Sequence, residues 1–290
     1  MSHFDWYSGS FHGDHAGFVG AVCERAGACV ESREKGRHGF AHAVRLRADR
    51  GFHALVQWGG ALHGDRVHAA FSGWRTNEGA ELFRELVPWH RLSRVDVAED
   101  LVGDGAMSEL RRLSSAIARQ HGVKRCRIVP DDEGAGETIY IGSRTSPVFA
   151  RIYEKGKQLR ADREHIDAAQ LAVDLKGHPL EAWVRCEVEI KPKSQAKDPR
   201  LAHLAPDAYW GAAQWSADLF ERLGGAHVER IRVGSVWRPD DYTRTVRALV
   251  GQYGRFLESL CDDLGSWACV GAQLGDEIAA ARARKAGGRS

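Results

Sequence analysis

Hydrophobic and polar side chains alternate with a period of two along several short segments in the first two thirds of the chain. This alternation is typical of strands that bury one face and expose the other. It predicts strands over residues 40–46, 52–58, 67–71, 93–101, 138–141, 148–155 and 183–190. Glycines and a Ser-Pro pair lie between these segments, as expected of turns that connect strands.

Apolar residues spaced three and four apart predict helices over residues 18–26, 80–87, 108–121, 166–175, 205–223 and 240–264, with one more from Trp267 onward. The stripe around Leu249, Phe256 and Leu260 is expected to be core. Short strands interspersed with helices predict an α+β fold: a largely antiparallel central sheet with flanking helices, followed by a helical C-terminal region.

The character of the sequence changes near residue 195, where a basic stretch over residues 191–199 resembles a connector. We therefore expect two regions, a sheet-containing domain over residues 1–195 and a helical region over residues 196–290. The two long helices of the second region are separated by Gly265-Ser266. They are compatible with a helix-turn-helix, but their apolar stripes are equally typical of helices that pack into a core.

Three of the predicted strands place their polar chemistry on one face. The residues that share such faces are Asp96 and Asp100 in the first strand, Arg151, Tyr153 and Lys155 in the second, and Arg185, Glu187 and Glu189 in the third. Carboxylate oxygens are the ligands preferred by Mg²⁺ and Mn²⁺. If the strands are neighbours, this face suits a divalent metal, a phosphate and an oxygen nucleophile.

Short motifs follow one another in a fixed order along the chain. They are Asp5-Trp6, Trp58-Gly59-Gly60, Phe71-Ser72-Gly73 and the segments 93–100, 138–144, 151–156 and 183–189. In this order the chain resembles the replication initiation factors of rolling-circle plasmids and filamentous phages, the trans-acting Rep type. The resemblance implies a metal-dependent DNA nicking-closing endonuclease, a strand transferase.

In that family the tyrosine of the Arg-Ile-Tyr-x-Lys strand attacks DNA, which here means Tyr153. Attack would form a 5′-phosphotyrosyl bond and free a 3′-hydroxyl for a polymerase, and the enzyme would later rejoin the ends. Arg151 and Lys155 would bind the phosphate or lower the tyrosine pKa. The expected ligands of Mg²⁺ or Mn²⁺ are Asp96 and Glu187, with Asp100 and Glu189 as further ligands or supporting groups.

The resemblance also implies partners. The substrate would be origin DNA, either double-stranded, locally melted or single-stranded at the nick. No Gly-x-x-x-x-Gly-Lys-Ser/Thr motif occurs, so unwinding is expected to need a host helicase, and extension a host polymerase. A homodimer is also compatible with the sequence.

Composition narrows the picture in a few respects. The net charge of +2 over 290 residues means that DNA contacts must come from local patches. One candidate is the basic segment 107–128. The six cysteines show no metal-ligand spacing, and no two of the fourteen histidines are one residue apart, which favours a carboxylate-based metal site. No export signal or membrane-length apolar run is visible, so we expect a cytoplasmic protein.

Two other function classes remain open at this stage. A metal nuclease could use the same carboxylates with water as the nucleophile and leave no protein adduct. A non-catalytic protein could bind origin DNA and recruit other replication proteins without cutting it. Taken singly, Tyr153 could be a packed strand residue and the carboxylates could belong to a solvated face.

Overall fold

The computed structural model describes residues 2–123, 126–130, 134, 136–161, 175–193, 198–234 and 241–287. The chain separates into two compact units, Met1–Val236 (unit 1) and Trp237–Ser290 (unit 2), which are described in turn. Unit 1 carries the residues predicted for catalysis.

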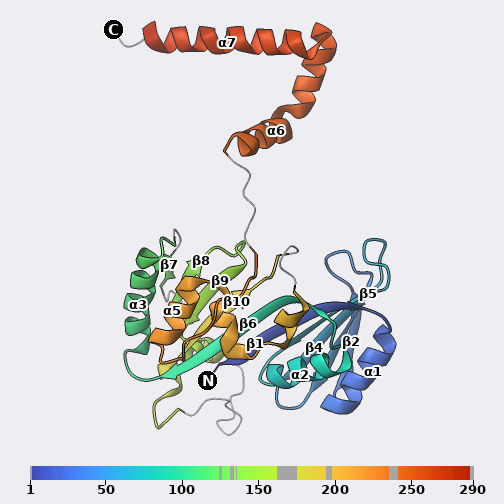
Figure 1. Ribbon diagram of the computed structural model, residues 1–290, viewed down its shortest axis with the longest axis vertical. Coiled ribbons are helices and arrows are strands. Elements are labelled where there is room, and N and C mark those ends of the chain that lie inside the picture. Colours follow the sequence, from blue (N-terminus) through green and yellow to red (C-terminus); the bar gives the residue numbers. More distant parts are fainter. Residues whose placement is uncertain are drawn as a thin grey trace. The chain divides into compact units, whose positions relative to one another are not determined.

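Among the described residues, unit 1 contains one antiparallel sheet of ten strands in the order β2-β3-β4-β5-β1-β6-β10-β9-β8-β7 (Figure 1). The strands are β1 (His3–His12), β2 (Cys29–Lys35), β3 (His42–Ala48), β4 (Phe52–Trp58), β5 (Arg66–Ser72), β6 (Arg91–Val102), β7 (Cys126–Val129), β8 (Thr138–Gly142), β9 (Val148–Tyr153) and β10 (Trp183–Ile190). The predicted α+β class with a largely antiparallel sheet is confirmed.

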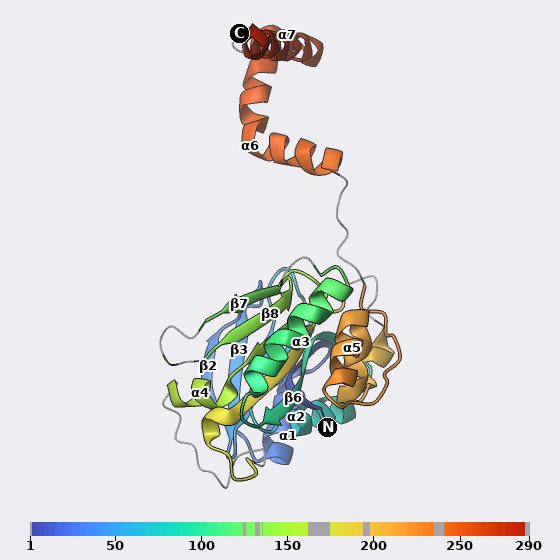
Figure 2. The same cartoon turned by 90° about the vertical axis from the view of Figure 1, so that its left-hand side faces the viewer.

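Helices cover one face of this sheet (Figure 2). They are α1 (His15–Ala26), α2 (Thr76–Leu86), α3 (Ala106–Gln120) and α5 (Gln214–Arg222), together with the 3₁₀ turns η4 (Pro199–His203) and η5 (Pro206–Ala212). The core lies between these layers. Val95 and Val97 of β6, Val188 of β10 and Phe83 of α2 are all fully enclosed there. The opposite face of the central strands is left to polar side chains.

Two further elements frame the polar side of the sheet. Helix α4 (Lys155–Ala161) follows β9, and the 3₁₀ turn η2 (Leu180–Ala182) leads into β10. The helix approaches the turn so closely that a Cβ on Gly156 would meet the carbonyl oxygen of Leu180 at 1.7 Å. Glycine at this position therefore allows α4 to begin directly beside β10.

The strands predicted from alternation leave out three strands of the sheet. β4 and β10 have the predicted bounds, whereas the central strand β1 and the edge strands β2 and β7 were not among the predicted segments. β2 is an edge strand with exposed or half-buried side chains, so it has no apolar alternation to reveal it. β9 was predicted to run to Lys155, but it ends at Tyr153, and Lys155 is the first residue of α4.

The helix predicted over residues 205–223 is interrupted. It divides into η5 and α5, because Ala213 between them has an extended backbone (φ −138°, ψ 152°). α1, α2 and α3 lie where predicted, with bounds shifted by a few residues. All but the last residue of the helix predicted at 166–175, and residues 194–197 of the basic connector, fall outside the described residues.

Unit 1 extends well past the boundary expected near residue 195. Residues from η4 to α5 return to the helix-covered side of the sheet and bury Leu201, Tyr209, Trp210 and Phe220. Burying a side chain of this size contributes about 1.5–3 kcal/mol. The compact unit therefore needs these residues, which the sequence placed in a separate region.

Unit 2 consists of α6 (Asp241–Leu264) and α7 (Trp267–Gly287), joined at Gly265 in a left-handed conformation (φ +78°). Within unit 2, α7 leaves the apolar stripe of α6 largely uncovered, with Phe256 62% and Val250 58% accessible. None of the described helices combines the length and the apolar character required to cross a membrane.

A fragment of residues 1–236 is expected to fold without unit 2, because the core of unit 1 and its sheet lie within these residues. Its melting temperature should remain within about 4 °C of the full chain, the shift that corresponds to roughly 1 kcal/mol. Circular dichroism and thermal unfolding measure this. A fragment without a cooperative transition would contradict the division into two units.

Candidate functional site

The three strands with polar faces are neighbours in the sheet, as expected. On β6 and β10, Asp96 is paired with Glu189 and Asp100 with Arg185. On β10 and β9, Arg185 is also paired with Tyr153. Because side chains at paired positions point to the same side of a sheet, these residues share one surface. We call it the polar face, and it lies opposite the helices.

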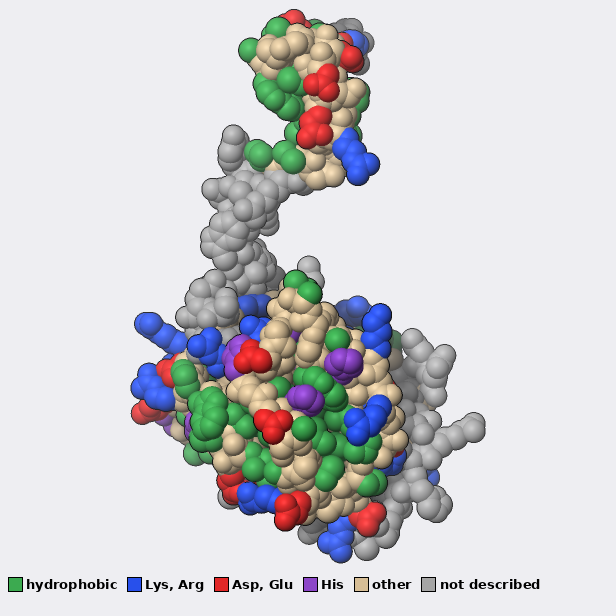
Figure 3. Space-filling view, turned by 90° about the vertical axis from the view of Figure 1, so that its right-hand side faces the viewer, with side chains coloured by type: hydrophobic (Ala, Val, Ile, Leu, Met, Phe, Trp, Pro, Cys, Tyr) green, Lys and Arg blue, Asp and Glu red, His purple; other side chains and the backbone are tan. Residues whose placement is uncertain are grey.

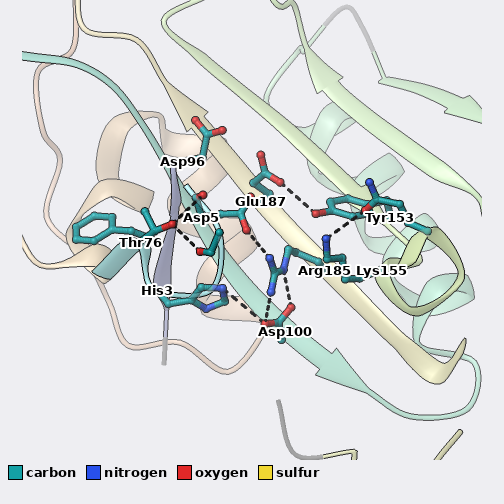
Figure 4. A network of polar contacts seen from close by, with 12 residues as sticks. His3, Asp5, Thr76, Asp96, Asp100, Tyr153, Lys155, Arg185 and Glu187 are labelled. Carbon is teal, nitrogen blue, oxygen red and sulfur yellow. Dashed lines mark hydrogen bonds and ion pairs between the residues drawn. The ribbon is translucent and has the colours of Figure 1, made fainter. Parts of the chain in front are cut away.

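Tyr153 lies on this face and points toward Glu187 (Figure 4), and Arg151 is paired with Glu187 across β9 and β10. Its hydroxyl donates a hydrogen bond of 3.4 Å to Glu187 Oε2. Arg151 Nη2 donates to both oxygens of the same carboxylate, at 3.0 and 2.8 Å, and the Arg151 guanidinium lies 4.8 Å from the centroid of the Tyr153 ring. One carboxylate thus holds the tyrosine and the arginine together.

The environment of Tyr153 opposes ionisation of its hydroxyl. Burial raises the pKa of Tyr153 well above its ordinary value, and the negative charges of Glu187 and Asp5 raise it further. Arg185 and Arg151 act in the opposite direction without cancelling the effect. The hydroxyl is therefore protonated at neutral pH, and a reaction at this oxygen requires removal of its proton.

Lys155 reaches the same place from α4. Its Nζ lies 5.8 Å from the centroid of the Tyr153 ring and 6.0 Å from that of Trp74. Lys155 was predicted from strand alternation, but β9 ends before it. The first turn of α4 nevertheless brings the Lys155 ammonium group close to Tyr153. Arg151, Tyr153 and Lys155 are thus brought together.

Asp96 is buried on β6 and bound by an arginine from its own strand. Arg94 Nε donates to Asp96 Oδ1 at 2.8 Å, Arg94 Nη2 donates to Oδ2, and the same Nη2 lies 3.0 Å from Glu189 Oε2. Burial raises the pKa of Asp96 well above its ordinary value. The charges of Glu187 and Glu189 add to this rise and Arg94 opposes it. The carboxylates around Asp96 therefore repel one another.

Asp100 has a different environment, centred on the buried Arg185. Arg185 donates from Nε and Nη2 to the two oxygens of Asp100 at 2.8 and 2.9 Å, and from Nη1 to Asp5. Trp183 Nε1 also donates to Asp100 at 2.7 Å, and His3 Nε2 lies 3.7 Å away. Burial acts to raise the pKa of Asp100, but Arg185 outweighs it, so the pKa lies below its ordinary value.

Asp100→Asn is expected to lower the free energy of unfolding by about 3 kcal/mol at pH 7, because it breaks a buried ion pair. The folded-state pKa of Asp100 lies below the unfolded value of about 3.9. The stabilisation is therefore present above that value and is lost as the pH falls through the folded pKa. Urea unfolding of both proteins at pH 7, 5 and 3 measures this, and a difference that grows in acid would contradict the ion-pair role.

The residues of the polar face fit a hard divalent cation through two carboxylates. Among the described residues, no three His, Cys, Asp or Glu side chains converge as a metal cluster. Asp96 and Glu187, however, lie on adjacent strands, and a cation would offset both the burial and the repulsion by Glu187 that raise the pKa of Asp96. Mg²⁺ in phosphoryl-transfer sites is commonly held by one or two carboxylates, with water and substrate phosphate completing the shell.

Sequence reasoning missed Asp5 and Arg94 as parts of this arrangement. Asp5 lies in β1 where the register with β6 shifts between Phe4 and Trp6, so strand alternation could not assign its direction. Arg94 was not among the residues assigned to the charged strand faces, yet it contacts both Asp96 and Glu189. An arginine two residues before a buried aspartate on one strand face is the signal that could have revealed it.

Charge elsewhere on unit 1 is mixed. On the side that carries α1 and β2, Lys and Arg side chains are interspersed with Asp and Glu side chains around a group of hydrophobic residues (Figure 3). This agrees with the small net charge of the chain. On the polar face, by contrast, side chains of opposite charge lie together beside Tyr153.

Comparison with known proteins gives two findings. A family model described as replication initiation factor (Rep_trans) matches residues 90–214, a range that includes Asp96, Tyr153 and Glu187. The chain is also similar to a solved rolling-circle replication initiator protein from Geobacillus stearothermophilus, with 17% identity over 84% of this chain and 90% of that chain and a TM-score of 0.48. The search of curated proteins returned no match. The resemblance predicted from the strand motifs is confirmed by the family model, in that residues 90–214 are similar to the replication initiation factors.

Proposed function

We propose that this protein starts rolling-circle replication by nicking origin DNA with Tyr153 as the nucleophile. The observation that carries the proposal is the hydrogen bond from the Tyr153 hydroxyl to Glu187 on the polar face, between Arg151 and Lys155. A nucleophile and a proton acceptor thus lie within hydrogen-bond distance of each other, and two cations lie beside the tyrosine ring. This combination supports attack on a phosphodiester.

In the proposed reaction, Tyr153 Oη attacks the scissile phosphorus while its proton passes to Glu187 Oε2, the group that already accepts its hydrogen bond. A bond forms between Tyr153 Oη and phosphorus, and the bond between phosphorus and the 3′-oxygen breaks. The leaving 3′-oxygen takes a proton from solvent. The products are a 5′-phosphotyrosyl linkage and a 3′-hydroxyl that a polymerase can extend.

Rejoining is the reverse displacement. A 3′-hydroxyl attacks the phosphotyrosine, the phosphodiester forms again, and Tyr153 recovers its proton. Because the covalent linkage conserves the phosphoester bond, no nucleotide hydrolysis is needed for this step. Arg151 and Lys155 would contact the phosphate oxygens in both directions.

We propose that Asp96 and Glu187 hold Mg²⁺ or Mn²⁺, with Glu189 next to them and Asp100 as a supporting group. When bound, such an ion polarises the scissile phosphate and offsets its charge. Asp100 is given the supporting role, because Trp183 donates to it in addition to Arg185 and its pKa already lies below the ordinary value, whereas the pKa of Asp96 is raised. It positions Arg185, whose positive charge opposes the rise in the Tyr153 pKa.

The partners follow from the reaction. The enzyme would bind origin DNA that is single-stranded or melted at the nick, and a host helicase and polymerase would act after it. A homodimer and a cytoplasmic location belong to the same proposal. Unit 2 remains a candidate for recognition of duplex origin DNA or for packing.

Incubation with supercoiled DNA that carries the cognate origin, in Mg²⁺ or Mn²⁺, tests the proposal. We expect a nicked circle and a protein-DNA adduct that survives denaturation. A nick without an adduct would indicate a water-dependent metal nuclease. Origin binding without a nick would indicate a non-catalytic replication protein.

A further inference from the structure

A pocket opens on the polar face next to the Tyr153 site. Its volume is about 230 Å³, many times the roughly 10–15 Å³ that a single water occupies, so it has room for a phosphate group. The residues that line it are Arg94, Arg144, Phe149, Arg151, Glu187, Glu189 and Lys191. Glu187 and Arg151 also contact Tyr153, so the pocket adjoins the residues proposed for catalysis.

The lining has more positive than negative charge. Four of its side chains are cations and two are carboxylates, an excess of two positive charges. Three of the cations already face carboxylates: Arg94 and Lys191 contact Glu189, and Arg151 contacts Glu187. Their charges are largely balanced within the protein.

Arg144 differs from the other three cations. Among the described residues of the pocket lining, it is the cation without a carboxylate partner. It follows β8, and its guanidinium lies 5.5 Å from the ring centroid of Tyr140 and 5.9 Å from that of Phe149. The two rings are stacked, with centroids 5.7 Å apart. The aromatic pair supports the guanidinium while leaving its N–H donors for a ligand.

We propose that this pocket binds a backbone phosphate of the single-stranded DNA next to the cleaved bond, with Arg144 supplying the charge that the phosphate neutralises. A guanidinium donates two parallel hydrogen bonds to a phosphate, which suits an anion that must be held in a fixed register. The inference rests on the proposed nicking function and adds a second phosphate contact beside the scissile one. Arg144 is thus a positioning residue for the DNA strand.

Binding of a fluorescein-labelled single strand of twelve thymidines tests this, measured by anisotropy over a range of salt concentrations in the full-length Tyr153→Phe protein. Each phosphate contact on single-stranded DNA contributes about 0.7 to the slope of log affinity against log salt. Adding Arg144→Gln is expected to reduce that slope by about 0.7 and to weaken binding about tenfold at low salt. The ring stack should persist, so the melting temperature should not change.

Arg222→Gln is the matched control, because Arg222 is an exposed arginine on α5, which covers the other face of the sheet and lies outside the basic segment 107–128. It removes the same charge and should leave the slope unchanged. An equal effect of both substitutions, or none from Arg144→Gln, would overturn the proposed subsite. Failure of the nicking function would show separately, as an absent adduct in the protein that retains Tyr153.

Discussion

Tyr153→Phe is expected to abolish nicking of origin DNA and formation of the covalent adduct. The substitution removes the oxygen that would attack phosphorus and keeps the ring that packs beside Arg151. Removal of an enzyme nucleophile lowers the rate by roughly 10⁶-fold in a well-studied case. The 3.4 Å hydrogen bond to Glu187 is long, so its loss should cost little stability.

Nicking and adduct formation are measured on denaturing gels, and DNA binding by anisotropy on the same preparations. The variant should bind the origin as tightly as the wild type and melt at nearly the same temperature. If Tyr153→Phe still forms the adduct, the assignment is wrong. Tyr140, which is paired with Arg151 across β8 and β9, would then be the next suspect.

Asp96→Asn and Glu187→Gln are each expected to lower the cleavage rate by about 10²–10³-fold, the loss typical of one electrostatic contribution to a transition state. Both substitutions keep the shape of the side chain and remove a charge that would bind the cation. Excess Mn²⁺ should restore part of the activity, because it binds a given set of oxygen ligands more tightly than Mg²⁺. EDTA should stop cleavage by the wild type.

Glu99→Gln is the matched control for these two substitutions. Glu99 lies on β6 three residues after Asp96, and its Oε1 accepts a hydrogen bond of 2.6 Å from Ser2 Oγ. The charge lost is the same, but Glu99 is outside the polar face, so cleavage should continue. Full activity of Asp96→Asn, or activity of the wild type in EDTA, would contradict a metal held at Asp96.

Strand periodicity was sufficient to predict the centre of the molecule. β6, β9 and β10 are buried on one face by Val and Ile residues, which makes the direction of Asp96, Tyr153 and Glu187 readable from alternation alone. Alternation alone could not show that the three strands are neighbours, because strand order is a property of the whole topology. That expectation came from the order of the motifs.

Other features depended on contacts that a sequence pattern does not contain. The ion pairs that Arg185 forms with Asp100 and Asp5 join β10 to β6 and β1, and these three residues are far apart in the sequence. The sequence also placed Trp210 in a separate C-terminal region. In the structure its indole is fully buried in unit 1 and donates a hydrogen bond to Ser2 Oγ, a long-range contact without a local signal.

The most direct test of the proposed mechanism is to identify the amino acid that becomes covalently linked to DNA. The adduct formed with origin DNA would be digested with nuclease and trypsin, and the modified peptide identified by mass spectrometry. Trypsin should release Ile152–Lys155, in which Tyr153 is the one tyrosine. We predict a nucleotide phosphate on this peptide. A nucleotide on any other peptide, or an origin that is nicked while every peptide remains unmodified, would contradict tyrosine attack by Tyr153.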